Sequence, residues 1–320
     1  MLAGLLPYGF ARYASKPGPS AIHALPSNAG GDSLEDPGTL QESGVKLFDS
    51  AGVAEPLGRE PAMELSRAPA PASKGTVLLD AWFNSQKRKN RLGKLEYFHY
   101  KWDDQSDTGY SIFGNLLNDY GYKTDTLYEA PTVEKLSSSA VYIIVSPDNP
   151  AKNPEPHYVT ARDAEQVAQW VRGGGVLLMM ENDPANADID HMNLLAEKFG
   201  IHFNAVLSHP VVGDAFPMGR IEVPAGGELF KRPHVLFMKD TCTISARGGA
   251  RALLVDKGDT LMAAAKYGKG AVFAAADPWL YNEYIDGHRL PAGYDNLDGA
   301  RELVNWLLGQ MQNPKTSENK

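Results

Sequence analysis

Acidic, amide and aromatic side chains gather directly after three apolar runs of the sequence, at residues 76–79, 176–180 and 271–276. Carboxylates and amides form hydrogen bonds with hydroxyl groups, and aromatic rings pack against the C–H face of a sugar ring. The combination therefore indicates a site for a polyhydroxylated ligand such as an oligosaccharide. The candidate ligand-binding residues are Asp80, Asn84, His99, Trp102, Asp103, Asn182, Asp183, His191, Asp277, Trp279, Tyr281, Asn282 and Glu283.

Each of these residues, taken singly, also fits an ordinary structural role. An aspartate that follows a strand commonly caps a helix or braces a loop, which applies to Asp80, Asp183 and Asp277. The two histidines can be satisfied by loop carbonyl groups, and the tryptophans can pack over the edge of a sheet. Only the coincidence of three such clusters indicates a site.

The same clusters contain candidates for catalysis. Glycoside hydrolysis needs two carboxyl groups at a defined separation, and Asp183 and Glu283 are the candidates, with His191 beside them. Their separation does not follow from the sequence. No catalytic residue is therefore assigned.

Other chemistries lack their motifs. Ser146 follows an apolar run as a nucleophile would, but Pro147 removes the next backbone N–H from an oxyanion hole. Cys242 is expected to be a small buried hydrophobic residue. No glycine-rich nucleotide motif occurs, and the sequence "DIDH" lacks a metal-ligand spacing. We expect no cofactor and no metal.

Alternating strand and helix patterns predict the fold. Apolar strands are expected at "TVLLD", "KTDTLY", "AVYIIV" and "VLLMM", and helices at "YSIFGNLLND", "ARDAEQVAQWV", "IDHMNLLAEKF" and "NLDGARELVNWLLGQ". Thr160 can cap the second helix, with Asp163 at its positive end. Such alternation indicates an α/β fold with a doubly wound, mostly parallel sheet, in which ligands bind beyond the carboxyl ends of the strands. Asp80, Asp183 and Asp277 are then expected side by side on one rim.

The remaining segments differ in character. Residues 205–260 predict a β-rich insertion of short strands and turns, and "TLMAAAKYGKGAVFAAAD" predicts a hairpin that turns at "YGKG". Residues 1–74 are dense in Pro, Ala, Gly and Ser and predict a disordered leader or linker, as in a detached part of a larger protein. The α/β domain is expected over residues 75–312, followed by a frayed tail over 313–320.

Bulk properties exclude several classes of protein. The net charge is −8 and the isoelectric point about 5.5, which disfavours a sequence-independent nucleic-acid binder. No apolar stretch is long enough to predict a membrane span. A single cysteine excludes an internal disulfide. The apolar opening of the chain lacks a preceding basic residue and contains Pro7, which disfavours a signal peptide.

From Thr76 to Gln310 the chain resembles the class I glutamine-amidotransferase-like, flavodoxin-type domain at the C-terminus of unsaturated rhamnogalacturonyl hydrolases of glycoside hydrolase families 88 and 105. The stretches that carry the likeness are "FHYKWDDQSDTGYSIFG", "YGYKTDTLYEAPT", "YIIVSPDNP", "WVRGGGVLLMMENDPANADIDHMNLLAEKFGIHFN" and "MAAAKYGKGAVFAAADPWLYNEYIDGHRLP". The family's catalytic barrel has no counterpart here. The amidotransferase triad is also missing, because Leu290 follows His288 where a glutamate would stand.

The resemblance implies a non-catalytic accessory or carbohydrate-contacting domain of a pectin-degrading system. A catalytic glycoside hydrolase domain or subunit would be its partner, and a bacterial periplasmic or extracellular location would be expected. Two alternatives stay open. One is a glycan-active hydrolase that uses the clustered carboxylates, and the other is a structural module that forms homo-oligomers, like related domains that mediate trimer contacts in some galactosidases.

Overall fold

The computed structural model of the protein describes residues 74–286 and 288–311. The leader expected over residues 1–74, apart from Lys74, and the tail expected over 313–320 lie outside the described residues. No helix in the described part of the chain has the length and apolar character that a membrane crossing requires.

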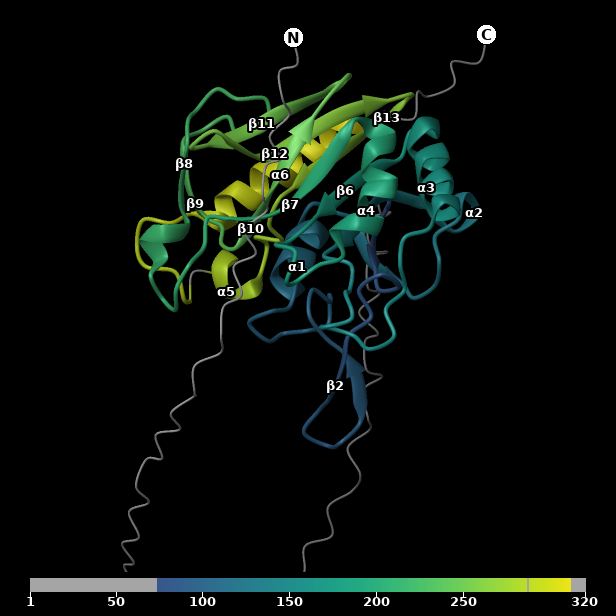
Figure 1. Ribbon diagram of the computed structural model, residues 1–320, viewed down its shortest axis with the longest axis horizontal. Coiled ribbons are helices and arrows are strands. Elements are labelled where there is room, and N and C mark those ends of the chain that lie inside the picture. Colours follow the sequence, from purple (N-terminus) through teal and green to yellow (C-terminus); the bar gives the residue numbers. More distant parts are fainter. Residues whose placement is uncertain (1–73, 287, 312–320) are drawn as a thin grey trace, which may run out of the picture. The chain divides into compact units, whose positions relative to one another are not determined.

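A seven-stranded sheet forms the centre of the described fold (Figure 1). Five strands run parallel: β1 (Thr76–Asp80), β4 (Lys123–Leu127), β5 (Ser139–Val145), β6 (Val176–Met180) and β13 (Gly270–Ala275). Their spatial order is β4-β1-β5-β6-β13, and β12 (Asp259–Tyr267) and β11 (Ala250–Asp256) extend the sheet antiparallel beside β13. The expected α/β class with a mostly parallel sheet is therefore confirmed.

Burial explains why these segments form strands. Every residue of β6 and β13 is buried, as expected for central parallel strands covered on both faces. In β4 at the sheet edge, the first four residues alternate between exposed and half-buried positions and only Leu127 is buried. The carboxyl ends of β1, β6 and β13 consequently share one edge of the sheet. That edge carries the three clusters of polar residues.

Helices cover the sheet in two groups. The helices α1 (Ser111–Asp119), α5 (Asn282–Ile285) and α6 (Asn296–Gln310) contact one another. In the second group, α3 (Ala161–Gly173) contacts both α2 (Val133–Leu136) and α4 (Ile189–Ala196). In Figure 1, α3 and α4 lie in front of the sheet and α6 lies behind it. Two short 3₁₀ helices, η1 (Glu197–Phe199) and η2 (Phe216–Gly219), complete the helical elements.

Local signals account for the helix boundaries. Thr160 caps the start of α3, as the sequence predicted, and Asp163 completes a reciprocal capping box with it. Gly174 ends the helix with a φ of 129°. In α6, Leu303, Trp306 and Leu307 are buried, as expected for its core-facing side.

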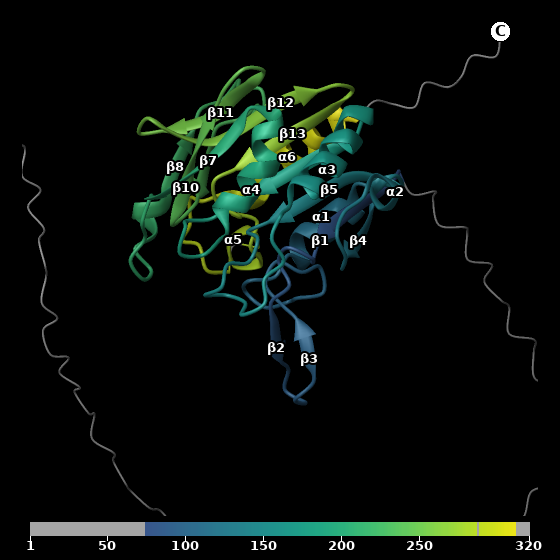
Figure 2. The same ribbon diagram turned by 45° about the vertical axis from the view of Figure 1, so that its right-hand side comes forward.

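The β-rich region expected over residues 205–260 forms two small antiparallel pairs beside the main sheet and also supplies the sheet's edge strand β11. The strand β7 (Ile201–Ser208) pairs with β10 (Thr241–Ala246), and β8 (Arg220–Val223) pairs with β9 (His234–Phe237). The hairpin turn at "YGKG" is confirmed by the pairing of Tyr267 with Gly270. One element was not predicted, a hairpin of β2 (Lys87–Lys89) and β3 (Leu95–Tyr97) that projects away from the rest of the fold (Figure 2).

Candidate ligand-binding site

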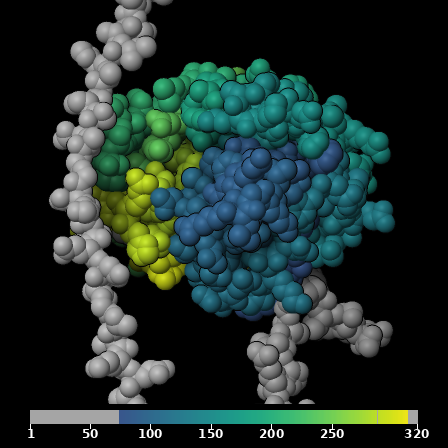
Figure 3. All heavy atoms as spheres, turned by 90° about the horizontal axis from the view of Figure 1, so that it is seen from below, coloured from purple at the N-terminus to yellow at the C-terminus, as the bar shows by residue number. Residues whose placement is uncertain are grey.

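A cavity of about 200 Å³ lies at the carboxyl ends of the parallel strands. Segments far apart in the sequence build it: the connection from β3 to α1, the loops after β5, β6 and β13, and the connection from β9 to β10. Figure 3 looks at this edge of the molecule, where the segment after β1 (blue) meets the segment after β13 (yellow). The lining residues are His99, Tyr100, Thr108, Lys152, Asn182, Asn186, Lys239, Asp240, Asp277, Tyr281 and Glu283.

Asp277 is the most perturbed carboxyl group of this lining. It follows β13, is 2% exposed, and accepts a hydrogen bond from the Lys239 backbone N–H at 3.1 Å. Burial raises its pKa to about 8, and the nearby charges of Asp240 and Asp183 act in the same direction. At neutral pH the group is therefore mostly protonated, so it can donate a hydrogen bond as well as accept one.

Aromatic groups form one wall of the cavity. The hydroxyl groups of Tyr100 and Tyr281 are 2.8 Å apart, and the His99 ring stacks on Tyr100 with centroids 4.0 Å apart. Burial lowers the pKa of His99 to about 4, and the charges of Lys101 and Lys152 lower it further. The imidazole is thus neutral at neutral pH and presents one donor and one acceptor.

Backbone strain is concentrated around the cavity. His99, Tyr100 and Asp240 have φ values of 67°, 57° and 49°, a region that residues with side chains seldom adopt. The His99 N–H is held by the Asp104 carboxylate at 3.0 Å, and Asp240 accepts a hydrogen bond from the Val211 N–H at 3.0 Å. Such conformations persist only where surrounding contacts enforce them, and they cluster at functional sites.

Polar groups of both charges complete the lining. Asn182 accepts a hydrogen bond from the Asp183 N–H at 2.9 Å. Glu283 pairs with Arg289 at 2.9 Å, whereas the ammonium groups of Lys152 and Lys239 form no ion pair with any described residue. Within the described residues, no group of three or more His, Cys, Asp or Glu side chains is arranged to hold a metal ion. The arrangement suits hydrogen bonding to a small polar ligand.

Five of the predicted residues come together in this cavity: His99, Asn182, Asp277, Tyr281 and Glu283. They represent all three of the sequence clusters. Of the catalytic candidates, only Glu283 lines the cavity. Asp183 accepts hydrogen bonds from the Ala185 N–H and the Asn186 amide. His191 lies on α4, where it contacts Asp188 at 2.8 Å and stacks on Tyr158.

The first cluster contributes mainly structural contacts. Asp80 is 1% exposed and accepts hydrogen bonds from the Phe83 N–H and the Tyr142 hydroxyl, both at 2.7 Å. Asn84 donates to the Ser146 carbonyl at 2.8 Å. Asp80 therefore does not stand with Asp277 at the cavity.

The other candidates have partners of their own. Trp102 donates to the Asp125 carbonyl at 3.0 Å, and Asp103 is exposed outside the cavity. Trp279 is 0% exposed, so its ring offers no face to a sugar. Asn282 is 4% exposed and bonds to the start of α1, where its oxygen accepts from the Ile112 N–H at 3.0 Å.

Several lining residues were not among the predicted set. Lys239 and Asp240 come from the β-rich region, whose placement over the sheet edge does not follow from its sequence. Lys152 lies in the segment "DNPAKNPEPH", which reads as a surface loop. Tyr100 and Thr108 lie between β3 and α1, and their closeness in the sequence to His99 and Asp103 was the available signal.

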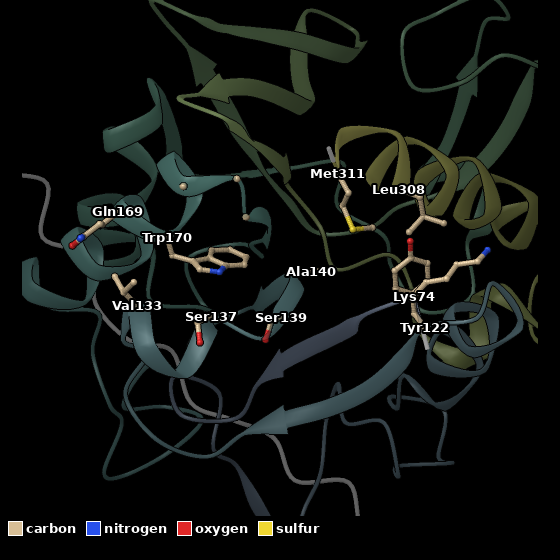
Figure 4. Close-up of a pocket in the computed structure, with 13 residues that line it drawn as sticks. Lys74, Tyr122, Val133, Ser137, Ser139, Ala140, Gln169, Trp170, Leu308 and Met311 are labelled. Atoms are coloured by element: carbon tan, nitrogen blue, oxygen red, sulfur yellow. The ribbon is translucent and has the colours of Figure 1, made fainter. Parts of the chain in front are cut away.

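A larger cavity of about 840 Å³ lies at the opposite edge of the sheet, near the starts of β5 and β6 (Figure 4). Trp170, Leu308 and Met311 contribute much of its apolar lining, and three consecutive glycines at the end of α3, residues 173–175, lie there as well. It is bordered by Lys74 and Met311, the first and last described residues. The larger cavity lacks a convergent set of titratable groups. The 200 Å³ cavity is therefore the better candidate for a ligand-binding site, although it is smaller.

Comparison with known proteins identifies the fold but no family. No protein-family model and no curated protein matches the sequence. Among solved structures, the N-terminal domain of mmIFT52 matches with a TM-score of 0.53 and 18% identity, over 73% of this chain and 97% of that chain. This level of likeness shows a shared fold alone.

Two further structures match less closely. The cytoplasmic protein STM1381 from Salmonella typhimurium LT2 gives a TM-score of 0.47 and 14% identity, over 74% of this chain and 100% of that chain. The exo-beta-1,4-mannosidase Op5Man5 from Opitutaceae bacterium strain TAV5 gives 0.42 and 16%, over 75% of this chain and only 36% of the mannosidase. Both TM-scores are too low to support an argument about this protein.

These findings correct the resemblance drawn from the sequence. The assignment to the amidotransferase-like domain of unsaturated rhamnogalacturonyl hydrolases was wrong, because no protein-family model matches the sequence and the fold comparison leads to the N-terminal domain of mmIFT52 instead. The stretches that suggested the likeness mostly cover apolar parallel strands, their polar carboxyl ends and amphipathic helices. Many unrelated α/β proteins share that pattern.

Proposed function

We propose that the protein binds a small polyhydroxylated ligand, about the size of one sugar residue, in the 200 Å³ cavity. The observation that supports this most strongly is the convergence of neutral hydrogen-bonding groups from distant segments, namely Asp277, Asn182 and Tyr281. Pockets for drug-sized ligands usually enclose about 300–1,000 Å³. The smaller volume here suits a single ring.

The chemistry of the lining supports a sugar over an apolar ligand. A sugar hydroxyl donates one hydrogen bond and accepts others, so it pairs best with groups that also do both. The protonated Asp277, the neutral His99 and the Tyr281 hydroxyl are such groups. Asn182 and Asn186 add amide groups at the same cavity.

The position of the cavity also supports binding. In chain order the parallel strands are arranged 2-1-3-4-5, the order of flavodoxin-type doubly wound folds, and we propose that type for this domain. Ligands of such folds bind outside the carboxyl ends of the strands. The cavity lies at that edge.

A hydrolase that acts on glycans is the second candidate. Asp277 would serve as the general acid, because its pKa of about 8 keeps it protonated at neutral pH, and Glu283 in the same cavity would supply the second carboxylate. In this function the variant Asp277→Asn abolishes sugar release but retains binding. The binding function alone requires no turnover.

Isothermal titration calorimetry of the full chain with a panel of monosaccharides tests the binding function. We expect heat of binding for at least one sugar, and a loss of affinity of about tenfold or more in Asn182→Ala, because a buried hydrogen bond to the ligand is lost. The variant Asn118→Ala, an exposed position on α1, is the matched control. Absence of heat with every sugar, or equal affinity in both variants, would contradict the proposal.

A further inference from the structure

The hairpin of β2 and β3 exposes apolar side chains at its tip. Leu92 is 93% exposed and Leu95 is 60% exposed, and both lie on an element that projects beyond the rest of the described fold (Figure 2). Single exposed leucines are common on protein surfaces. Leu92, however, lies in the turn of a projecting hairpin, where no neighbouring element of the described fold prevents its side chain from contacting an apolar surface outside the protein.

The hairpin is held in a defined shape. The Asn90 side chain accepts hydrogen bonds from the N–H groups of Leu92 and Lys94, both at 3.0 Å, and its backbone N–H donates to the Lys94 carbonyl at 2.9 Å. On the strand behind this turn, Arg88 pairs with Glu96 at 3.0 Å and with Asp104 at 3.1 Å. These contacts fasten the hairpin to the body and present Leu92 in a fixed loop.

Positive charge surrounds the leucines. The exposed cations Lys87, Lys89, Arg91 and Lys94 lie within eight residues of sequence, in a chain whose net charge is −8. In the described part of the chain, none of the four forms an ion pair, whereas Arg88 pairs with Glu96 and Asp104. The register pairs Lys89 with Leu95, so a cation and a leucine share one face of the hairpin.

We propose that this hairpin is a docking surface for an anionic phospholipid bilayer. The Leu92 side chain enters the boundary between headgroups and acyl chains, and the four cations bind the lipid phosphates around it. Apolar insertion combined with electrostatic attraction is the general basis of reversible binding to membrane surfaces. The cations alone would attract any polyanion, but the exposed leucines gain free energy only from an apolar phase.

Two observations favour a bilayer over nucleic acid. A single-stranded nucleic acid is bound by aromatic rings that stack on its bases, but the Tyr97 ring is covered by the Lys87 ammonium group, 4.7 Å from its centroid. The outermost side chain of the hairpin is aliphatic and offers nothing to a base or phosphate. Tyrosine and lysine beside leucine are instead a usual combination at the interface of a membrane with water.

Vesicle flotation of the full chain tests the inference. We expect the protein to float with vesicles of equimolar phosphatidylcholine and phosphatidylserine, and not with phosphatidylcholine alone. The charge reversal Lys89→Glu should lower the partition coefficient about tenfold, because one attraction is lost and one repulsion is added. The variant Leu92→Asp should lower it at least as much.

Matched controls separate the hairpin from general surface effects. Val212 is 74% exposed on another loop, and Lys266 is exposed on β12, so Val212→Asp and Lys266→Glu should leave flotation unchanged. Equal far-ultraviolet circular dichroism in all variants would show that each remains folded. Three results would overturn the proposal: absence of flotation, flotation that Leu92→Asp does not reduce, or binding of a single-stranded oligonucleotide in place of vesicles.

Discussion

Burial gives Asp277 a role in the pH dependence of stability. The folded protein retains its proton up to about pH 8, whereas the unfolded chain releases it near 3.8. The unfolded state therefore binds fewer protons between these values. In this range the free energy of unfolding falls as the pH rises, and above pH 8 the contribution is constant.

The variant Asp277→Asn should remove this loss of stability. Its amide has no proton to release, and its oxygen can still accept from the Lys239 N–H. Above pH 8 the variant should be more stable than the parent by on the order of a few kcal/mol, with the difference shrinking towards pH 4. Urea unfolding at a series of pH values measures it, with Asp103→Asn at an exposed position as the control. A constant difference at every pH would contradict the assignment.

Asn282 shows how a polar residue near a site can serve the fold instead. Its amide nitrogen lies within 3.2 Å of the carbonyls of Asp104 and Ser106 and 2.9 Å from the Ser111 hydroxyl, while its oxygen accepts from the N–H of Ile112. These bonds tie α5 to the start of α1. The sequence places Asn282 beside Tyr281 and Glu283 but cannot show which of them faces the cavity.

Replacing Asn282 with alanine should therefore destabilise the protein. The change leaves buried backbone groups without partners, which costs roughly 1–3 kcal/mol. The midpoint of urea unfolding should fall, while Asn118→Ala at an exposed position should leave it nearly unchanged. If Asn282→Ala unfolds at the parent's midpoint, the four hydrogen bonds contribute nothing and the residue is free for a ligand.

At the level of elements, two glycines in helices should respond oppositely to the same substitution. A Cβ atom at Gly114 in α1 would lie 2.9 Å from the Trp102 ring, whereas nothing lies within 4 Å of one at Gly309 in α6. Alanine gains up to about 1 kcal/mol of helix propensity over glycine. At Gly114 this gain is outweighed by overpacking, which typically costs about 1–3 kcal/mol.

Gly114→Ala should thus be destabilising and Gly309→Ala neutral or stabilising. Displacement of Trp102 would also disturb its hydrogen bond to the Asp125 carbonyl, so the fluorescence of the first variant should change. Thermal unfolding of the two variants beside the parent gives the comparison. If both substitutions stabilise the protein, the Trp102 ring moves away from the new methyl group without a loss of stability.

Elements with strong local signals were predictable, and those held by distant contacts were not. The helix α3 has its capping box, its apolar face and its glycine stop within its own sequence. The hairpin of β2 and β3 has strands of three residues, "KRK" and "LEY", without a buried face. It depends on the Asn90 turn and on the pairing of Arg88 with Glu96, which no periodic pattern reveals.

At the scale of the whole molecule, the rule for parallel sheets located the edge but not the individual contacts. The carboxyl ends of β1, β6 and β13 share one edge of the sheet as expected. The segments directly after β6 and β13 line the cavity, whereas the third group of lining residues lies between β3 and α1. Whether a side chain enters that cavity depends on neighbours from elsewhere in the fold. Asp80 accepts a hydrogen bond from the Tyr142 hydroxyl instead of facing the cavity. The Trp279 ring packs against Gly299, which has no side chain to displace it.

The seven-stranded sheet and the helices that cover it lie within the described residues, which predicts the behaviour of a shortened chain. The seven strands of this sheet and the helices on both of its faces lie between Thr76 and Gln310. A variant that starts at Lys74 should therefore unfold cooperatively at the same midpoint as the full chain. This would agree with the linker expected from the composition of residues 1–74.

Thermal unfolding followed by circular dichroism provides the measurement, and hydrogen exchange locates any difference. Lys74 and Met311 border the large cavity, so removal of the residues before Lys74 should affect the backbone around this cavity first. If the leader only tethers the domain, exchange at Gly173, Gly174 and Gly175, which line this cavity, stays the same. A lowered midpoint with faster exchange at these glycines would show that residues before Lys74 stabilise the domain and are not a linker.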